Sequence, residues 1–280
     1  MKRILMATDL SERSDRALRR AVALASAFRT ELEVVHVVEE AWLEAITSQI
    51  EKTAHDAIAQ QLQSIDAAKS VQPNIKVLRG WDHQDIIERS RELDVDLIVL
   101  GVHRHKAPEL FQGTTAERVI RHGDRPVLVV KDAVSGPYRK AIVAVDLSAH
   151  SVAAASCAAR LVHDGHVCFV HAMHRPFVGF LGRDSQEPHL RDERTRIATA
   201  MDKMIGDVSA VCESDVPEFS KAVDAGDVRG ILRANAERLK PDLLAVGTHG
   251  RGGVAHAVLG SVAADILADA PCDVLVAKAA

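Results

Sequence analysis

Short apolar runs alternate along the whole chain with stretches of helical periodicity. The runs lack polar alternation, which is typical of strands buried on both faces of a parallel sheet. In the first half we predict strands at residues 4–8, 32–38, 75–78, 96–100 and 127–130, and helices at 14–28, 44–69, 84–92 and 115–121. In the second half we predict strands at 141–145, 167–170, 219–223, 243–246 and 274–276, and helices at 152–162, 191–211, 228–239 and 261–267.

The second half repeats the first. The opening strand and its Asp-Leu-Ser ending at residues 2–11 return at 140–148, so that Asp9 aligns with Asp146, and residues 96–101 return at 242–247. The numbering offset between matching residues of the two copies increases in the middle. We therefore place an insertion in the second copy at the Gly- and Pro-containing residues 174–187. The sequence therefore predicts two domains, 1–135 and 136–280, joined by a short turn.

Each copy alternates strand and helix in the order βαβαβαβαβ. This order predicts an α/β, Rossmann-like domain with a doubly wound, parallel, five-stranded sheet. In such sheets ligands bind beyond the carboxyl ends of the strands, near the switch in strand order. Three features of the second half meet at that edge: Asp146 after its first strand, the end of its second strand at His171 and Ala172, and the loop that begins at Gly247.

Composition narrows the class of protein. The 280 residues fit two domains, and 47% apolar with 26% charged residues is ordinary for a soluble chain. The net charge of −4 leaves no basic stripe, so we expect no nucleic-acid partner. We find no signal-peptide core and no apolar stretch long enough to cross a membrane, and the four cysteines form no C-x-x-C pair. We expect a cytoplasmic protein with reduced thiols and no membrane partner.

The loop that follows the fourth strand of the second half is rich in glycine. Gly247 and Gly250 allow backbone to approach a ligand, and Gly260 with Ser261 opens a helix whose N–H groups suit a phosphate. We expect Ser261 to cap that helix. The spacing matches neither the P-loop nor G-x-G-x-x-G. Taken alone, a purely structural loop explains it equally well.

The duplicated order and the pattern Gly247-x2-Gly250-x9-Gly260-Ser261 resemble the universal stress protein family, over essentially the whole chain as two tandem domains. The resemblance implies a fold like that of the adenine nucleotide alpha hydrolases, two domains related by a pseudo-twofold axis, and ATP as ligand, with or without Mg²⁺. It implies adenine or ribose contacts from Asp146 and from the backbone near Ala172. It implies ribose and phosphate contacts from Gly247, His249, Gly250, Gly260, Ser261 and the backbone of Val262.

The resemblance further implies that the two domains pair with each other through their last strands, with a homodimer as an open possibility. Ala263 stands where some ATP-binding members of the family carry a polar residue. A polar side chain there would add a contact to the phosphates, so its loss weakens the predicted phosphate site slightly.

The first half departs from the pattern. Its loop keeps Gly101, Gly113 and Thr114, but Arg104 replaces the second glycine. Arg104 either adds charge to a modified anion site or marks a degenerate loop kept for packing, and we favour the latter because a Cβ is costly at a positive φ. Asp9 is present but is also explained as a helix cap.

Other candidates have simpler explanations. His103, His105, His171 and His174 lack acidic or cysteine partners at zinc-ligand spacing, so we expect solvated or hydrogen-bonded histidines. Trp42 and Trp81 are expected to pack rather than to stack on bases. We expect residues 191–196 to form the solvent-exposed face of a long helix.

Three functions remain. The first is an ATP-binding, nucleotide-dependent regulatory protein of the stress response. The second is an enzyme that slowly hydrolyses ATP or transfers adenylyl groups, against which stands the absence of a lysine or second carboxylate in the loop 247–261. The third is a scaffold without nucleotide.

Overall fold

The computed structural model describes residues 1–39, 44–102, 113–162, 164–173, 183–212, 216–250 and 259–279, with side chains from residue 190 onward in the fifth range. The chain divides into two compact units. Unit 1 contains Met1–Pro137 together with Leu259, and unit 2 contains the other described residues from Tyr138 onward. The division falls two residues beyond the join expected between 135 and 136.

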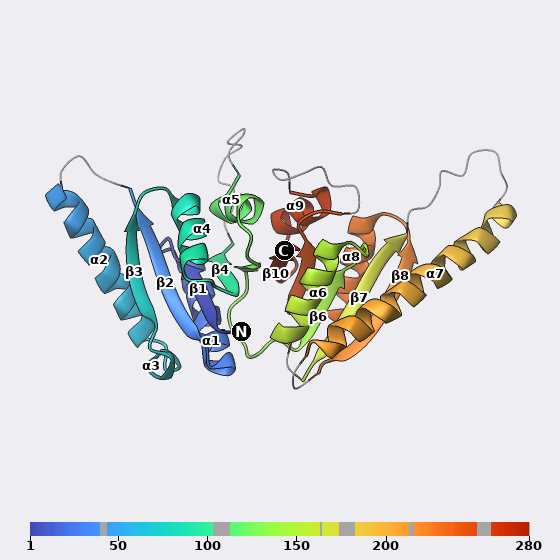
Figure 1. Cartoon of the computed structure of the whole chain (residues 1–280), viewed down its shortest axis with the longest axis horizontal. Helices are drawn as coiled ribbons and strands as arrows, with labels where there is room; N and C mark the ends of the chain where they lie inside the picture. The colour runs from blue at the N-terminus through green and yellow to red at the C-terminus, as the bar shows by residue number, and fades with distance from the viewer. Residues whose placement is uncertain are drawn as a thin grey trace. The chain divides into compact units, whose positions relative to one another are not determined.

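Unit 1 is a parallel sheet covered by helices (Figure 1). Its strands lie in the order β3-β2-β1-β4-β5, so the order switches between β1 and β4. Its elements are β1 (Arg3–Ala7), α1 (Glu12–Phe28), β2 (Glu31–Val38), α2 (Glu44–Gln63), α3 (Ala68–Val71), β3 (Asn74–Arg79), α4 (Asp82–Glu92), β4 (Leu97–Gly101), α5 (Thr115–His122) and β5 (Val127–Val130).

Unit 2 repeats this architecture with parallel strands in the order β8-β7-β6-β9-β10. The switch in strand order falls between β6 and β9. Its elements are β6 (Lys140–Ala144), α6 (Ala149–Leu161), β7 (His166–Met173), α7 (Arg183–Ala210), β8 (Glu218–Ala225), α8 (Val228–Leu239), β9 (Leu243–Gly247), α9 (Ser261–Ala268) and β10 (Asp273–Ala277). The predicted α/β class and doubly wound sheets are confirmed.

The central strands form the core of each unit. Ile4, Leu5 and Met6 of β1 are fully buried, as are Ile142 and Val143 of β6. Because helices cover both faces, the positions inside these strands are apolar, while Arg3 at the start of β1 is partly exposed and Lys140 at the start of β6 is exposed. The rigid sheets fix the positions of the strand ends where the pockets lie.

Two helices differ from the prediction. The helix expected over 44–69 ends at Gln63, where the Ser64 hydroxyl donates to the Gln61 carbonyl and competes with the helical pattern. Helix α7 begins at Arg183 rather than at residue 191, so part of the expected insertion is helical, while residues 174–182 lie outside the described part. Residues 191–196 are exposed, as predicted. None of the described helices is both long and apolar enough to cross a membrane.

Candidate functional site

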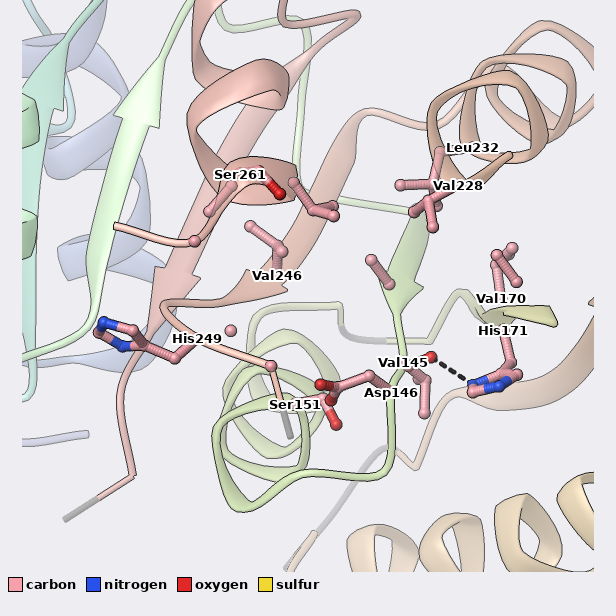
Figure 2. A pocket seen from close by; sticks show the side chains of 17 residues that line it. Val145, Asp146, Ser151, Val170, His171, Val228, Leu232, Val246, His249 and Ser261 are labelled. Atoms are coloured by element: carbon pink, nitrogen blue, oxygen red, sulfur yellow. Dashed lines mark hydrogen bonds between the residues drawn. The ribbon is translucent and has the colours of Figure 1, made fainter. Parts of the chain in front are cut away.

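Unit 2 contains a pocket of about 340 Å³ at the carboxyl ends of β6, β7 and β9 and at the start of α9 (Figure 2). All eight residues predicted for the site line it. They are Asp146, Ala172, Gly247, His249, Gly250, Gly260, Ser261 and Val262. Apolar side chains that were not predicted for the site complete the wall, among them Val170, Val228 and Leu232. The topology therefore gathers residues that lie more than a hundred positions apart in the chain.

The turn after β6 holds Asp146 at the pocket. The Asp146 carboxylate accepts a hydrogen bond from the Ser148 backbone N–H at 2.9 Å, and Leu147 between them has a φ of 63°. Ser148 then caps α6 by accepting from the Ser151 N–H. Asp146 is thus held by the turn that starts a helix, and its side chain points into the pocket (Figure 2).

Two glycines leave space at the pocket. A Cβ added at Gly250 would lie 2.9 Å from Oδ2 of Asp146, and one at Gly260 would lie 3.0 Å from the carbonyl oxygen of Thr248. Both separations are shorter than ordinary van der Waals contact, so side chains at either position would displace their neighbours. Gly247 has a different role, because a Cβ there would lie 2.8 Å from the backbone of His150 in α6. It allows β9 and α6 to pack closely.

The N-terminus of α9 carries no side-chain cap. Gly260 occupies the cap position, and Ser261 is the first helical residue. The expectation that Ser261 caps this helix is therefore wrong, because the extended cap residue is the preceding one. Backbone N–H groups at an uncapped helix N-terminus suit an anion. Ser261 lines the pocket instead of satisfying that terminus.

Two histidines border the pocket in different ways. Nδ1 of His171 lies 2.7 Å from the carbonyl oxygen of Val145 (Figure 2). His249 lies with its ring 5.5 Å from that of His150, and its Nε2 is buried with no hydrogen-bond partner among the described residues. Burial, together with the nearby His249 and Lys278, lowers the pKa of His150, while Asp146 opposes the shift.

Unit 1 has a pocket of about 260 Å³ at the equivalent strand ends. Asp9 and Gly101 line it, but Gly113 and Thr114 are not among its described lining residues. Thr114 instead caps α5, accepting from the Glu117 N–H at 3.2 Å. Arg104 lies outside the described residues. This cap was not predicted, although Thr114-x-x-Glu117 is a recognisable capping box.

The tryptophans, the cysteines and the other histidines have different positions in the structure. Trp81 was expected to pack but is 71% exposed, because it precedes α4 at the N-cap position, outside the core. Cys168 and Cys272 are buried and Cys157 and Cys212 partly so, and these four cysteines form no disulfide among the described residues. Trp42, His103, His105 and His174 lie outside the described residues. Within the described ranges, no group of three or more His, Cys, Asp or Glu side chains could hold a metal ion.

The duplicated doubly wound fold, with a pocket near the switch in strand order of each unit, defines a tandem α/β protein. The model of the Universal stress protein family matches residues 1–131 and again 137–278. The chain therefore belongs to the universal stress protein family, in a tandem form.

Known relatives agree with this assignment. Universal stress protein A homolog 1 of Coxiella burnetii is 29% identical over 140 residues, which cover 46% of this chain and 95% of the relative. Two solved structures share the fold over both units. A universal stress protein from Archaeoglobus fulgidus aligns at a TM-score of 0.65 and 20% identity over 99% of this chain and 98% of its own. One described as a putative universal stress protein, from Pseudomonas aeruginosa, aligns at 0.65 and 18% over 99% and 93%.

Proposed function

We propose that this universal stress protein binds ATP in the pocket of unit 2 and acts in the cytoplasm as a nucleotide-dependent regulator of the stress response. The observation that carries the proposal is the convergence of all eight predicted residues on one pocket of about 340 Å³. Its volume suits a small organic ligand.

The two ends of the pocket suit the two ends of a nucleotide. Val170, Val228 and Leu232 offer an apolar wall for a purine base. At the other end, the uncapped N-terminus of α9 and the space left by Gly250 and Gly260 suit phosphate groups. The carboxylate of Asp146 lies within the same pocket and suits a ribose hydroxyl.

Mg²⁺ enters this proposal as a companion of the phosphates. Mg²⁺ in nucleotide sites is usually held by one or two carboxylates, by the phosphates and by water. Asp146 is the one carboxylate among the described lining residues. In this proposal Asp146 contacts the ribose, so the phosphates and water would hold the ion, which would neutralise phosphate charge.

Binding without rapid turnover fits this chemistry. The described part of the lining holds no Lys or Arg side chain that could stabilise charge developing on a transferred phosphoryl group. We therefore infer a regulatory site rather than a catalytic one.

Calorimetric titration of the full chain with MgATP tests the proposal. Gly250→Val places a branched side chain against Asp146, and Gly260→Val places one against the Thr248 carbonyl, so each should weaken ATP binding by tenfold or more. Gly206→Ala in α7 is the matched control, since a Cβ there meets nothing within 4 Å.

The proposal fails if purified wild-type protein does not bind ATP, or if both valine variants bind as tightly as Gly206→Ala. Mass spectrometry of ligand released from the purified protein gives an independent answer. Adenine nucleotide should be recovered from the wild type and should be depleted in the valine variants.

A further inference from the structure

The pocket of unit 1 retains the part of the unit 2 pocket that suits a base. Both pockets lie at the ends of the first, second and fourth strands of their unit. The paired apolar lining residues are Ala7 and Ala144, Val35 and Val170, Ile86 and Leu232, and Ala116 and Ala263. A flat heterocycle that fits one pocket therefore meets a similar apolar wall in the other.

The phosphate end is different, because α5 is capped by its own residues. Thr114 accepts from the Glu117 N–H, and Glu117 lies so close to Gly113 that a Cβ on that glycine would overlap its carboxylate. A negative carboxylate at the helix N-terminus competes with an anionic ligand for the same N–H groups. In unit 2 the residue aligned with Glu117 is Ala264, which leaves the start of α9 open.

Asp82 changes the wall opposite β1. It stands in unit 1 where Val228 stands in unit 2, on the first turn of the corresponding helix. Its carboxylate accepts from the Thr115 hydroxyl and, at 2.6 Å, from the His83 N–H. Burial alone would raise the pKa of Asp82, but these hydrogen bonds outweigh it and lower that pKa. The side chain is 47% exposed, so an ionised acceptor remains within reach of a ligand.

The charged side chains among the described lining residues of the unit 1 pocket do not favour an anion either. Arg13 is the one cation among the described lining residues, and the carboxylates of Asp9 and Asp82 outnumber it. Among the described residues, a polyanionic phosphate chain therefore gains neither an open helix terminus nor a surplus of positive charge. A neutral ligand that donates hydrogen bonds avoids both penalties.

We propose that the pocket of unit 1 is a second ligand site that binds a nucleoside without phosphate groups, with Asp82 accepting a hydrogen bond from the exocyclic amine or a ribose hydroxyl. The choice of a nucleoside rests on the function proposed for unit 2. Selection against phosphate rests on Glu117 and Asp82, which belong to unit 1 alone.

Tryptophan fluorescence gives a readout confined to unit 1. The chain has two tryptophans, Trp42 and Trp81, and Trp81 directly precedes Asp82. In the full chain carrying Trp42→Phe and Gly250→Val, adenosine should change the Trp81 emission saturably. AMP and ATP should need at least tenfold higher concentrations. Asp82→Val, which installs the unit 2 residue, should weaken adenosine binding about tenfold, since a hydrogen bond to a charged group is lost.

Asp82→Asn keeps the shape of the side chain and shows whether the charge matters, while Glu117→Ala should raise the affinity for AMP relative to adenosine. The proposal is overturned if adenosine does not bind, if ATP binds as tightly as adenosine, or if folded Asp82→Val and Asp82→Asn proteins both bind adenosine unchanged. If the wild type does not bind ATP, the function proposed for unit 2 is contradicted. The adenosine measurement still tests unit 1 by itself, because it is made in a protein that carries Gly250→Val.

Discussion

Nδ1 of His171 lies 2.7 Å from the carbonyl oxygen of Val145, and the duplicated His36 makes the same contact with Thr8 at 2.7 Å. A carbonyl oxygen can only accept, so each imidazole carries its proton on Nδ1. The bond ties the second strand of each unit to the residue that follows the first. Both contacts border a pocket, and the two units therefore share the support of their strand ends as well as their fold.

The duplication supplies a matched pair of variants for this contact. His171→Phe and His36→Phe should each cost about 1 kcal/mol in the free energy of unfolding, because each removes one hydrogen bond to a backbone carbonyl. Only His171→Phe should also weaken ATP binding, since only that residue lines the proposed ATP pocket. Urea unfolding and calorimetry measure the two effects. Equal losses of ATP affinity in both variants would contradict the assignment of the site to unit 2.

The strands and the glycine spacing were readable from the sequence because they depend on local pattern. Runs such as residues 4–8 and 243–246 are apolar because both sheet faces are covered, and Gly250 and Gly260 are required by close approach. The bond between Asp82 and Thr115 was not readable, since it joins residues 33 positions apart. Likewise, the exposure of Trp81 depends on where α4 packs. The cap of α9 was predicted one residue too late, at Ser261 instead of Gly260.

Breaking a largely buried ion pair should destabilise unit 1. Glu33 on β2 is 5% exposed and accepts from Nε of Arg89 at 2.5 Å and from Asn74 at 2.9 Å. Arg89→Ala leaves a buried carboxylate without its cation, so we expect a loss of about 3–5 kcal/mol. Its control is Arg91→Ala on the same helix, where the exposed pair with Asp124 should contribute less than about 1 kcal/mol.

Urea unfolding of the full chain measures both arginine variants. The double variant Glu33→Gln with Arg89→Met should recover part of the stability lost in Arg89→Ala, because it removes the unpaired charge. If Arg89→Ala and Arg91→Ala lose the same free energy of unfolding, the burial of Glu33 does not make its ion pair with Arg89 more stabilising than an exposed pair.

The single tyrosine of the chain anchors the start of unit 2. The Tyr138 hydroxyl donates to Oδ2 of Asp273 at 2.6 Å, and both residues are 1% exposed. Tyr138→Phe should lower the free energy of unfolding by about 1.5–3 kcal/mol, the usual contribution of a hydrogen bond to a charged group. A double-mutant cycle with Asp273→Ala isolates the pair, because alanine leaves no side-chain acceptor for the hydroxyl. A coupling energy near zero would mean that the stability lost in Tyr138→Phe comes from its packing and not from this hydrogen bond.

Acid should weaken unit 2 through His150. Its Nδ1 accepts from the Ala279 N–H at 2.9 Å, which requires an unprotonated nitrogen, and its pKa is lowered from 6.5 by burial, His249 and Lys278 against the opposing effect of Asp146. The unfolded chain therefore takes up this proton at a higher pH than the folded chain. The contribution of His150 to stability is fully present above about pH 6.5 and is lost as the pH falls from there toward the lowered pKa.

The measurement compares urea unfolding of the wild type with His150→Gln across that range, because the difference cancels the titration of the other histidines. The wild type should lose more stability than the variant as the pH falls below about 6.5. An NMR titration of the His150 ring should give a midpoint below that of an unfolded histidine. A constant stability difference at every pH, or a midpoint above 6.5, would contradict a neutral His150 that accepts from Ala279.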